Sequence, residues 1–93
     1  MKFQNWIDDI PSPNHEDGRT EVIGLFEFAE GVVQARIQAR TSDPAAWKRI
    51  MEAIETVGNL NLGLDTLPRE PDGSYRYGID LVGHRVEYVV PPR

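Results

Sequence analysis

Residues 21–40, EVIGLFEFAEGVVQARIQAR, give the clearest structural signal in the chain, because their polar and apolar side chains alternate. From 33 to 39 every odd position is apolar, and from 34 to 40 every even position holds Gln or Arg. A period of two is typical of a strand with one buried face. A matching strand precedes it, and the Glu30-Gly31 pair between them predicts a two-residue hairpin turn. The apolar face of that first strand carries Val22, Gly24, Phe26 and Phe28.

The register of this hairpin follows from the predicted turn. With Glu30 and Gly31 in the loop, Phe28 lies opposite Val33, and the apolar rows of the two strands share one face. A slip by one residue would bury arginine side chains, so the alternation favours this pairing. The further predicted pairs are Phe26 with Ala35, Gly24 with Ile37, Glu27 with Gln34, Leu25 with Arg36, and Glu21 with Arg40.

Residues 44–57 are predicted to form an amphipathic helix. Asp43 or Ser42 supplies the capping side chain, and Pro44 suits the first helical position. Apolar residues then recur with the helical period, and Gly58 suits the left-handed position that ends a helix. The apolar stripe consists of Trp47, Ile50, Met51, Ile54 and Val57.

A shorter helix is predicted over residues 2–10. Its apolar residues have the i, i+3, i+4, i+7 spacing of one helix face. Pro11 ends this helix, because proline restricts the residue before it and has no N–H to donate. The apolar positions are Phe3, Trp6, Ile7 and Ile10.

Residues 74–90 predict a second hairpin, with Val82 and Gly83 in its turn. This register pairs apolar residues on one face and places Asp80 opposite Arg85 on the other. The other predicted pairs are Leu81 with His84, Ile79 with Val86, Tyr77 with Tyr88, Tyr75 with Val90, and Gly78 with Glu87.

These elements together predict one α+β domain spanning residues 1–93. Alternating leucines at 60, 62 and 64 indicate a short additional strand before the second hairpin, which is given in brackets in the element order below. The expected element order is α-β-β-α-(β)-β-β. We expect a mainly antiparallel sheet of about four to five strands, with both helices on one face.

The composition excludes several kinds of chemistry. The 93 residues include no cysteine, which removes disulfides, thiolate zinc sites and thiol nucleophiles. The net charge is −5, whereas non-specific nucleic-acid binding depends on a surplus of Lys and Arg. No Gly-rich phosphate loop, GxSxG motif or HExxH motif occurs. We therefore expect no cofactor, no metal and no nucleic-acid partner.

Side chains that can coordinate a metal ion are clustered only near the N-terminus. This segment lacks the regular carboxylate spacing of a calcium-binding loop. We expect a solvated acidic loop there, formed by Asp8, Asp9, His15, Glu16 and Asp17. No apolar run reaches the ~18–20 residues that span a bilayer, and the N-terminus has no signal-peptide pattern. We therefore expect a cytoplasmic protein with no membrane partner.

The C-terminal hairpin is similar to one known family. Residues 75–88, YRYGIDLVGHRVEY, resemble the final hairpin of RelE-type ribosome-dependent toxins, in which Tyr and Arg recur in this manner. The resemblance implies a ribonuclease that cleaves mRNA on the ribosome. A nuclease or other small enzyme of this kind would act through Arg76, His84, Arg85 and Tyr88.

The outward face of the first hairpin is the candidate site. It combines guanidinium and amide groups with two apolar side chains, a mixture typical of a protein interface. We expect a non-catalytic, small acidic protein-binding module, such as an immunity protein, an antitoxin-like protein or a phage-type inhibitor. The alternatives are the RelE-like enzyme and a homo-oligomeric structural protein, such as a homodimer through this face. The predicted partner-binding residues are Ile23, Leu25, Gln34, Arg36, Gln38 and Arg40.

Overall fold

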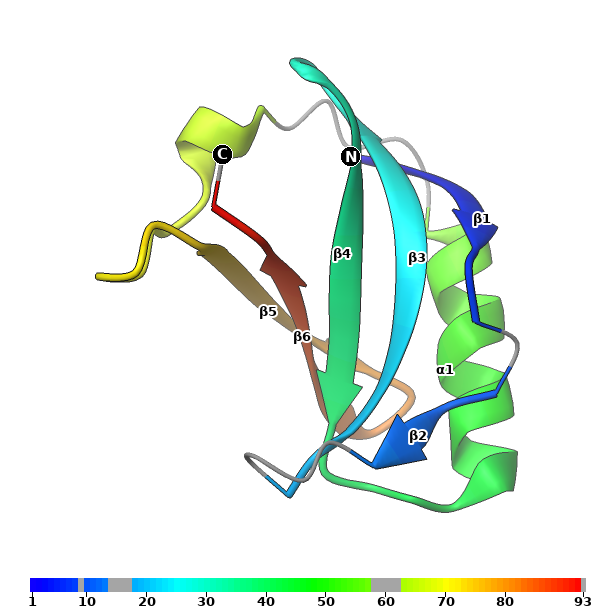
Figure 1. Cartoon of the computed structure of the whole chain (residues 1–93). Helices are drawn as coiled ribbons and strands as arrows, with labels where there is room; N and C mark the ends of the chain where they lie inside the picture. The colour runs from blue at the N-terminus through cyan, green and yellow to red at the C-terminus, as the bar shows by residue number, and fades with distance from the viewer. Residues whose placement is uncertain (9, 14–17, 58–62, 93) are drawn as a thin grey trace.

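A computed structural model describes residues 1–8, 10–13, 18–57 and 63–92 of the chain. In these parts of the chain, six strands form one antiparallel sheet, and one α-helix lies against a face of that sheet (Figure 1). The strand order is β1-β3-β4-β6-β5, and β2 pairs with β3 beside β1. The elements are β1 (Lys2–Trp6), β2 (Ser12–Pro13), β3 (Thr20–Phe28), β4 (Gly31–Ala39), α1 (Pro44–Thr56), the 3-10 helix η1 (Leu64–Thr66), β5 (Tyr75–Leu81) and β6 (His84–Val90).

The β3–β4 hairpin has the predicted faces, but the predicted register is wrong. Phe28 lies opposite Gly31 and Phe26 lies opposite Val33, so the pairing is displaced by two residues. The turn lies one residue earlier than predicted, at positions 29 and 30. An even displacement leaves every side chain on its predicted face. The other corrected pairs are Gly24 with Ala35, Val22 with Ile37, Leu25 with Gln34, Glu27 with Val32, and Glu21 with Gln38.

Two features explain the earlier turn. Gly31 begins β4 with a φ of 132°, a conformation that favours glycine, and so belongs to the strand instead of the loop. Glu30 stays in the turn, where its carboxylate accepts a hydrogen bond from the backbone N–H of Leu64 at 2.8 Å. This contact ties the hairpin to the start of η1, a segment far away in the sequence.

The helix predicted over residues 2–10 is wrong, because this segment contains β1. β1 pairs with β3, with Phe3 opposite Phe26, and its register shifts between Phe3 and Asn5. The extra residue of this bulge lets Phe3 and Trp6 contact the same part of the core, three positions apart. Their rings lie 4.8 Å apart, and both contact the ring of Phe26. A bulged strand therefore produces the spacing that indicated a helix face.

The helix predicted at 44–57 is confirmed as α1, which ends one residue earlier. Asp43 caps the helix as predicted, since its carboxylate accepts a hydrogen bond from a backbone N–H of the first turn. The indole N–H of Trp47 donates to the carbonyl of Thr41 at 2.6 Å, which fixes the helix against the loop that precedes it. The predicted terminator, Gly58, lies outside the described residues.

The C-terminal hairpin is confirmed in the predicted register, with Tyr77 opposite Tyr88. Val82 and Gly83 form the turn, and both have a positive φ, 44° and 82°. This backbone geometry matches the right-handed twist of the flanking strands, which makes it the favoured one for a two-residue hairpin loop.

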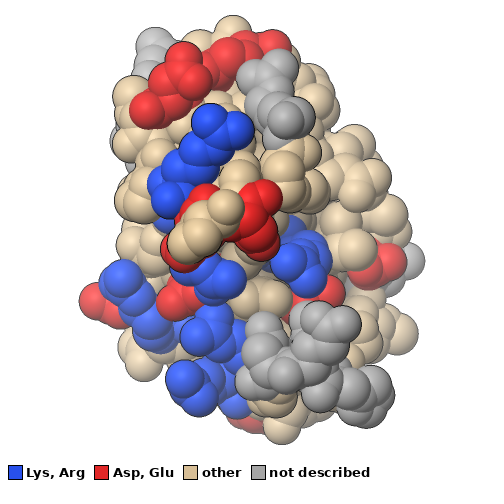
Figure 2. Space-filling model, turned by 60° about the vertical axis from the view of Figure 1, so that its left-hand side comes forward, with Lys and Arg blue, Asp and Glu red and all other residues tan. Residues whose placement is uncertain are grey.

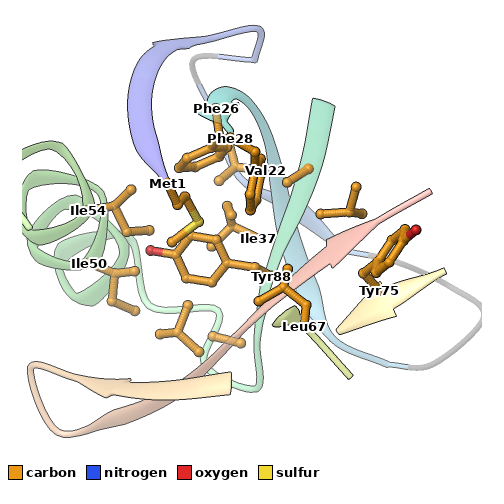
Figure 3. Close-up of a cluster of buried hydrophobic side chains, with 14 of the residues drawn as sticks. Met1, Val22, Phe26, Phe28, Ile37, Ile50, Ile54, Leu67, Tyr75 and Tyr88 are labelled. Carbon is orange, nitrogen blue, oxygen red and sulfur yellow. The ribbon is translucent and has the colours of Figure 1, made fainter. Parts of the chain in front are cut away.

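The two hairpins join through β4 and β6, which pair with Ile37 opposite Tyr88. In Figure 3, the side chains of Ile50 and Ile54 from α1 lie on one side of Ile37 and Tyr88. The side chain of Phe26 from β3 lies on a second side of these two residues. The Phe26 and Tyr88 rings meet edge to face with centroids 5.4 Å apart. The buried core also includes Met1, Val22, Phe28, Ala35, Ala39, Trp47, Leu64, Leu67, Tyr75, Val86 and Val90.

The fold class is α+β with a mainly antiparallel sheet, as predicted, but among the described residues the sheet has six strands instead of four to five, and the expectation of two helices is wrong. The described residues contain one α-helix, because the N-terminal segment adds a strand instead. Of the short additional strand, residues 60 and 62 lie outside the described parts of the chain, and Leu64 begins η1. β2 was not predicted; it pairs with β3 through Ser12 and Glu21.

Candidate functional site

The two faces of the sheet differ in chemistry. The face covered by α1, which we name the core face, is apolar. Side chains alternate along each strand, so the polar rows lie on the opposite face, which we name the outer face. Figure 2 brings the side away from α1 forward and shows blue Lys and Arg atoms gathered there among red acidic atoms. The arginines that belong to this side are Arg19, Arg36, Arg40, Arg76 and Arg85.

The six residues predicted to bind a partner lie on the outer face at unequal depths. Gln34 and Arg40 are exposed, Ile23, Leu25 and Arg36 are half-buried, and Gln38 is buried. The β3–β4 register places Ile23 opposite Arg36, so an apolar residue and an arginine are neighbours on this face. Gln38 is only 2% exposed, so it supports neighbouring side chains and has almost no surface for direct contact with a partner.

A network of ion pairs and hydrogen bonds crosses the outer face. Nη1 of Arg19 donates to Oε2 of Glu87 at 2.7 Å and to Oε1 of Gln38 at 3.4 Å. Arg76 donates to the same oxygen of Glu87 from the neighbouring strand. The side-chain amide of Gln38 donates to Glu21 at 3.1 Å. One carboxylate, that of Glu87, therefore holds two guanidinium groups in place.

Sequence reasoning missed Arg19, Arg76 and Glu87 as parts of this surface. Part of the signal was present, because the predicted register of the second hairpin puts Arg76, Arg85 and Glu87 on one face. The missing information was the β4–β6 pairing, which sets Gln38 opposite Glu87 and joins the polar faces of the two hairpins.

The pKa of Glu87 lies below its ordinary value. Burial of the side chain, which is 21% exposed, acts to raise this pKa. The hydrogen bonds and charges of Arg76 and Arg19 lower it and outweigh the effect of burial. Glu87 is therefore ionised at neutral pH, the form that both arginines need.

We expect the contribution of Glu87 to stability to disappear in acid. The folded pKa is below the unfolded one, so the contribution is present above the ordinary value of 4.5 and is lost as the pH falls through the folded pKa. Urea unfolding should show that Glu87→Gln is less stable than the parent chain at neutral pH. The difference should shrink steadily below pH 4.5, and a difference independent of pH would contradict this assignment.

A hollow of about 180 Å³ opens beside this network, near the end of β4. The residues that line it include Arg19, Arg40, Arg85, His84 and Glu87. Three guanidinium groups against one carboxylate leave a surplus of positive charge among these described residues. Such a surplus suits an oxyanion, because guanidinium groups bind carboxylates through paired, charge-assisted hydrogen bonds.

Arg85 reaches across the adjacent strand to the edge of the sheet. A Cβ atom at Gly78 would lie 2.7 Å from Nη2 of Arg85, so the glycine leaves the space that the guanidinium occupies. Arg85 lies 3.8 Å from Asp80, and these side chains are 63% and 80% exposed, so this ion pair is weak. Arg85 and Gly78 also line a second hollow, of about 570 Å³, together with Arg76 and residues 66–68.

The residues implied by the resemblance to toxins lie on both faces of the sheet. Arg76 and Arg85 belong to the outer face. Tyr88 is 1% exposed within the core, where burial, followed by the influence of Tyr77, raises the pKa of its phenol. His84 is half-buried at the end of the hairpin. The structure does not bring Tyr88 together with the arginines.

Most of the predicted acidic loop, Asp9 and residues 15–17, lies outside the described residues. Among the residues that the structure describes, no group of three or more His, Asp or Glu side chains is arranged to hold a metal ion. No helix in the same parts of the chain has the length and apolar character needed to cross a membrane.

The chain was compared with known proteins at the levels of family, sequence and structure. No protein-family model, no curated protein and no solved structure matches it. What the chain does is therefore inferred from its own residues.

Proposed function

We propose that this chain is a non-catalytic protein-binding module whose outer face binds a carboxylate-rich surface of a partner protein. The observation that carries this proposal is the gathering of arginines on one side of a chain with a net charge of −5. A surplus of acids in the composition gives no reason for arginines to gather on one side, where they lie among the acids of the same face. The one-sided placement therefore supports a recognition role for these arginines.

The chemistry of the outer face supports protein recognition. Neither Arg36 nor Arg40 forms an ion pair with another residue among those described, so both can donate hydrogen bonds to a partner. Ile23 and Leu25 add half-buried apolar area between the polar rows. Arginines beside apolar side chains are typical of the residues that carry binding energy in protein interfaces.

The size and the net charge favour one form of this module, a small inhibitor of the immunity or antitoxin kind. Acidic groups away from the outer face attract a basic enzyme over long distances and speed its encounter. The arginines then hold carboxylates of that enzyme at contact distance. Arg36 and Arg40 would anchor the complex, and the network around Glu87 would keep the neighbouring arginines in position.

We expect the double variant Arg36→Glu/Arg40→Glu to lose its partner. Reversing both charges replaces attraction by repulsion, so the affinity should fall by at least about tenfold, or ~1.4 kcal/mol. The measurement is affinity capture of the partner by the tagged full chain, followed by titration of the identified partner against both forms. Circular dichroism should show that the variant keeps the folded spectrum.

The matched control is Lys48→Glu/Arg49→Glu, which makes the same charge change at two exposed positions of α1. This control should bind the partner as the parent chain does, apart from a smaller change in association rate. Equal capture by the outer-face variant and the parent chain would contradict the proposal. Equal loss in both double variants would assign the effect to net charge instead of the outer face.

A further inference from the structure

The two edges of the sheet are protected unequally. A bulge interrupts β1 at one edge, and Pro13 of β2 has no N–H to offer a further strand. The other edge is β5, where residues 77–81 contain no proline, lysine or bulge. Natural proteins protect open strand edges with such features, because an open edge readily pairs with another chain. We name residues 77–81 the β5 edge.

Two hydrogen bonds show which backbone groups point away from β6. The N–H of Arg76 donates to the carbonyl of Pro68 at 3.0 Å, and the carbonyl of Ser74 accepts from Glu70 at 2.7 Å. Even-numbered residues of β5 therefore point their backbone groups outward, since these groups alternate along a strand. Beyond Arg76, the described parts of the chain provide no strand partner for Gly78 and Asp80 on that side.

We propose that the β5 edge pairs with the β5 edge of a second copy of this chain, antiparallel and about a two-fold axis at Ile79. In this register Gly78 lies opposite Asp80 of the second copy, and Asp80 lies opposite its Gly78. All the outward N–H and C=O groups of these residues then form hydrogen bonds between the copies. Such a symmetric, self-complementary interface closes at a dimer.

The neighbouring registers are less favourable. A two-fold axis at Gly78 would place a strand residue opposite Arg76, whose N–H is already bound to Pro68. A two-fold axis at Asp80 would set the two Asp80 carboxylates opposite each other, and like charges directly opposite are destabilising. With the axis at Ile79, the turn residue Val82 of the second copy comes opposite Arg76, so no strand residue has to pair there and the two Asp80 carboxylates stay apart.

Charges on the outer face match across this pairing. Asp80 of the second copy projects on the same face as the Arg85 guanidinium that lies over Gly78. Directly opposite residues have Cβ atoms about 4.5–5.5 Å apart, so this carboxylate comes within reach of the guanidinium. The weak ion pair between Arg85 and Asp80 within one chain leaves donors of Arg85 for the second copy.

Apolar side chains match on the core face. Ile79 meets Ile79 of the second copy, and Tyr77 meets its Leu81. All three side chains are half-buried at the edge of the apolar cluster, so pairing removes part of their exposed surface from water. The hollow of about 570 Å³ beside Gly78 leaves room for the hairpin turn of the second copy, whose Val82 is 46% exposed.

Pairing about this axis would continue the sheet from one copy to the other, with both outer faces on the same side. The dimer would therefore present two arginine surfaces to a partner, which strengthens binding to a partner with repeated sites. The proposal uses different residues from those tested for partner binding and does not depend on them.

Sedimentation of the full chain over a wide range of concentrations tests the proposal. We expect the mass to rise from the 10.5 kDa of one chain toward twice that value as the concentration increases. Asp80→Arg should raise the dissociation constant of the dimer at least about tenfold, since the introduced guanidinium would face Arg85 of the other copy. The double variant Asp80→Arg/Arg85→Asp should restore dimerisation, because the two charges exchange places.

Glu55→Arg, which makes the same charge change at an exposed position of α1, is the control and should dimerise normally. Amide hydrogen exchange should slow at Gly78 and Asp80 as the dimer forms. A parent chain that keeps the monomer mass at every concentration would overturn the proposal. Dimerisation of Asp80→Arg with unchanged affinity, or dimerisation of the parent chain without slower exchange at Gly78, would also overturn it. The variant Arg36→Glu/Arg40→Glu should still dimerise, which separates this test from partner binding.

Discussion

Trp47→Ala is expected to lower the free energy of unfolding by about 3–5 kcal/mol. The side chain is 2% exposed within the core, and its indole N–H donates to the carbonyl of Thr41 at 2.6 Å. The alanine variant would leave a cavity under α1 and an unsatisfied carbonyl where the helix begins. Small domains are stable by only about 5–15 kcal/mol, so much of the total would be lost. Urea unfolding followed by far-UV circular dichroism measures this change.

The control for this prediction is Trp47→Phe, which retains an aromatic ring but has no N–H. It should cost clearly less than the alanine variant, because most of the packing remains and mainly the hydrogen bond is lost. Gln34→Ala, at an exposed position, should change stability by no more than about 0.5 kcal/mol. A cost for Trp47→Ala as small as that of Gln34→Ala would show that α1 does not close the core through this side chain.

Phe26→Ala is the second substitution with a large expected effect, about 3–5 kcal/mol. Phe26 is 1% exposed and stands at the centre of an aromatic cluster. Its ring centroid lies 5.7 Å from that of Phe3, 6.5 Å from that of Trp6 and 5.4 Å from that of Tyr88. The substitution therefore removes contacts that connect β1, β3 and β6. The near-UV circular dichroism signal of the aromatic cluster should become weaker. The urea concentration at the midpoint of unfolding should fall as well.

Two comparisons separate this role from a general loss of aromatic area. Phe26→Leu keeps most of the apolar volume and should cost less than half as much as Phe26→Ala. Phe3→Ala removes a half-buried ring from the bulged edge strand and should also cost less. If Phe3→Ala destabilised the protein as much as Phe26→Ala, the cluster would not be centred on β3.

Only the part of the candidate surface that lies on the β3–β4 hairpin was predictable from the sequence. Alternation along residues 33–40 placed Arg36 and Arg40 on the face away from the core, and the structure has them there. The same alternation placed Gln38 beside them, yet Gln38 is buried by the network of Arg19 and Glu87. Burial on a polar face depends on neighbours from other strands, which no period within one strand reveals.

The N-terminal error has a related physical cause. Spacing of three residues between Phe3 and Trp6 fits a helix face, and it also fits a strand that contains a bulge. The N-terminal segment forms a strand because the edge of β3 is available for pairing. Pairing with β3 also brings Phe3 into contact with Phe26. A local pattern cannot show that such an edge is open.

Local patterns in the sequence were enough to predict the faces of the four hairpin strands, the capped helix α1 and the register of the β5–β6 hairpin. Each of these depends on alternation, a capping side chain or a short turn, all of which are local properties. Local patterns were not enough to predict the register of β3 with β4, the strand at the N-terminus or the pairing of the two hairpins through β4 and β6. These features depend on contacts between distant segments, such as Glu30 with the N–H of Leu64, and therefore on the free energy of the assembled core.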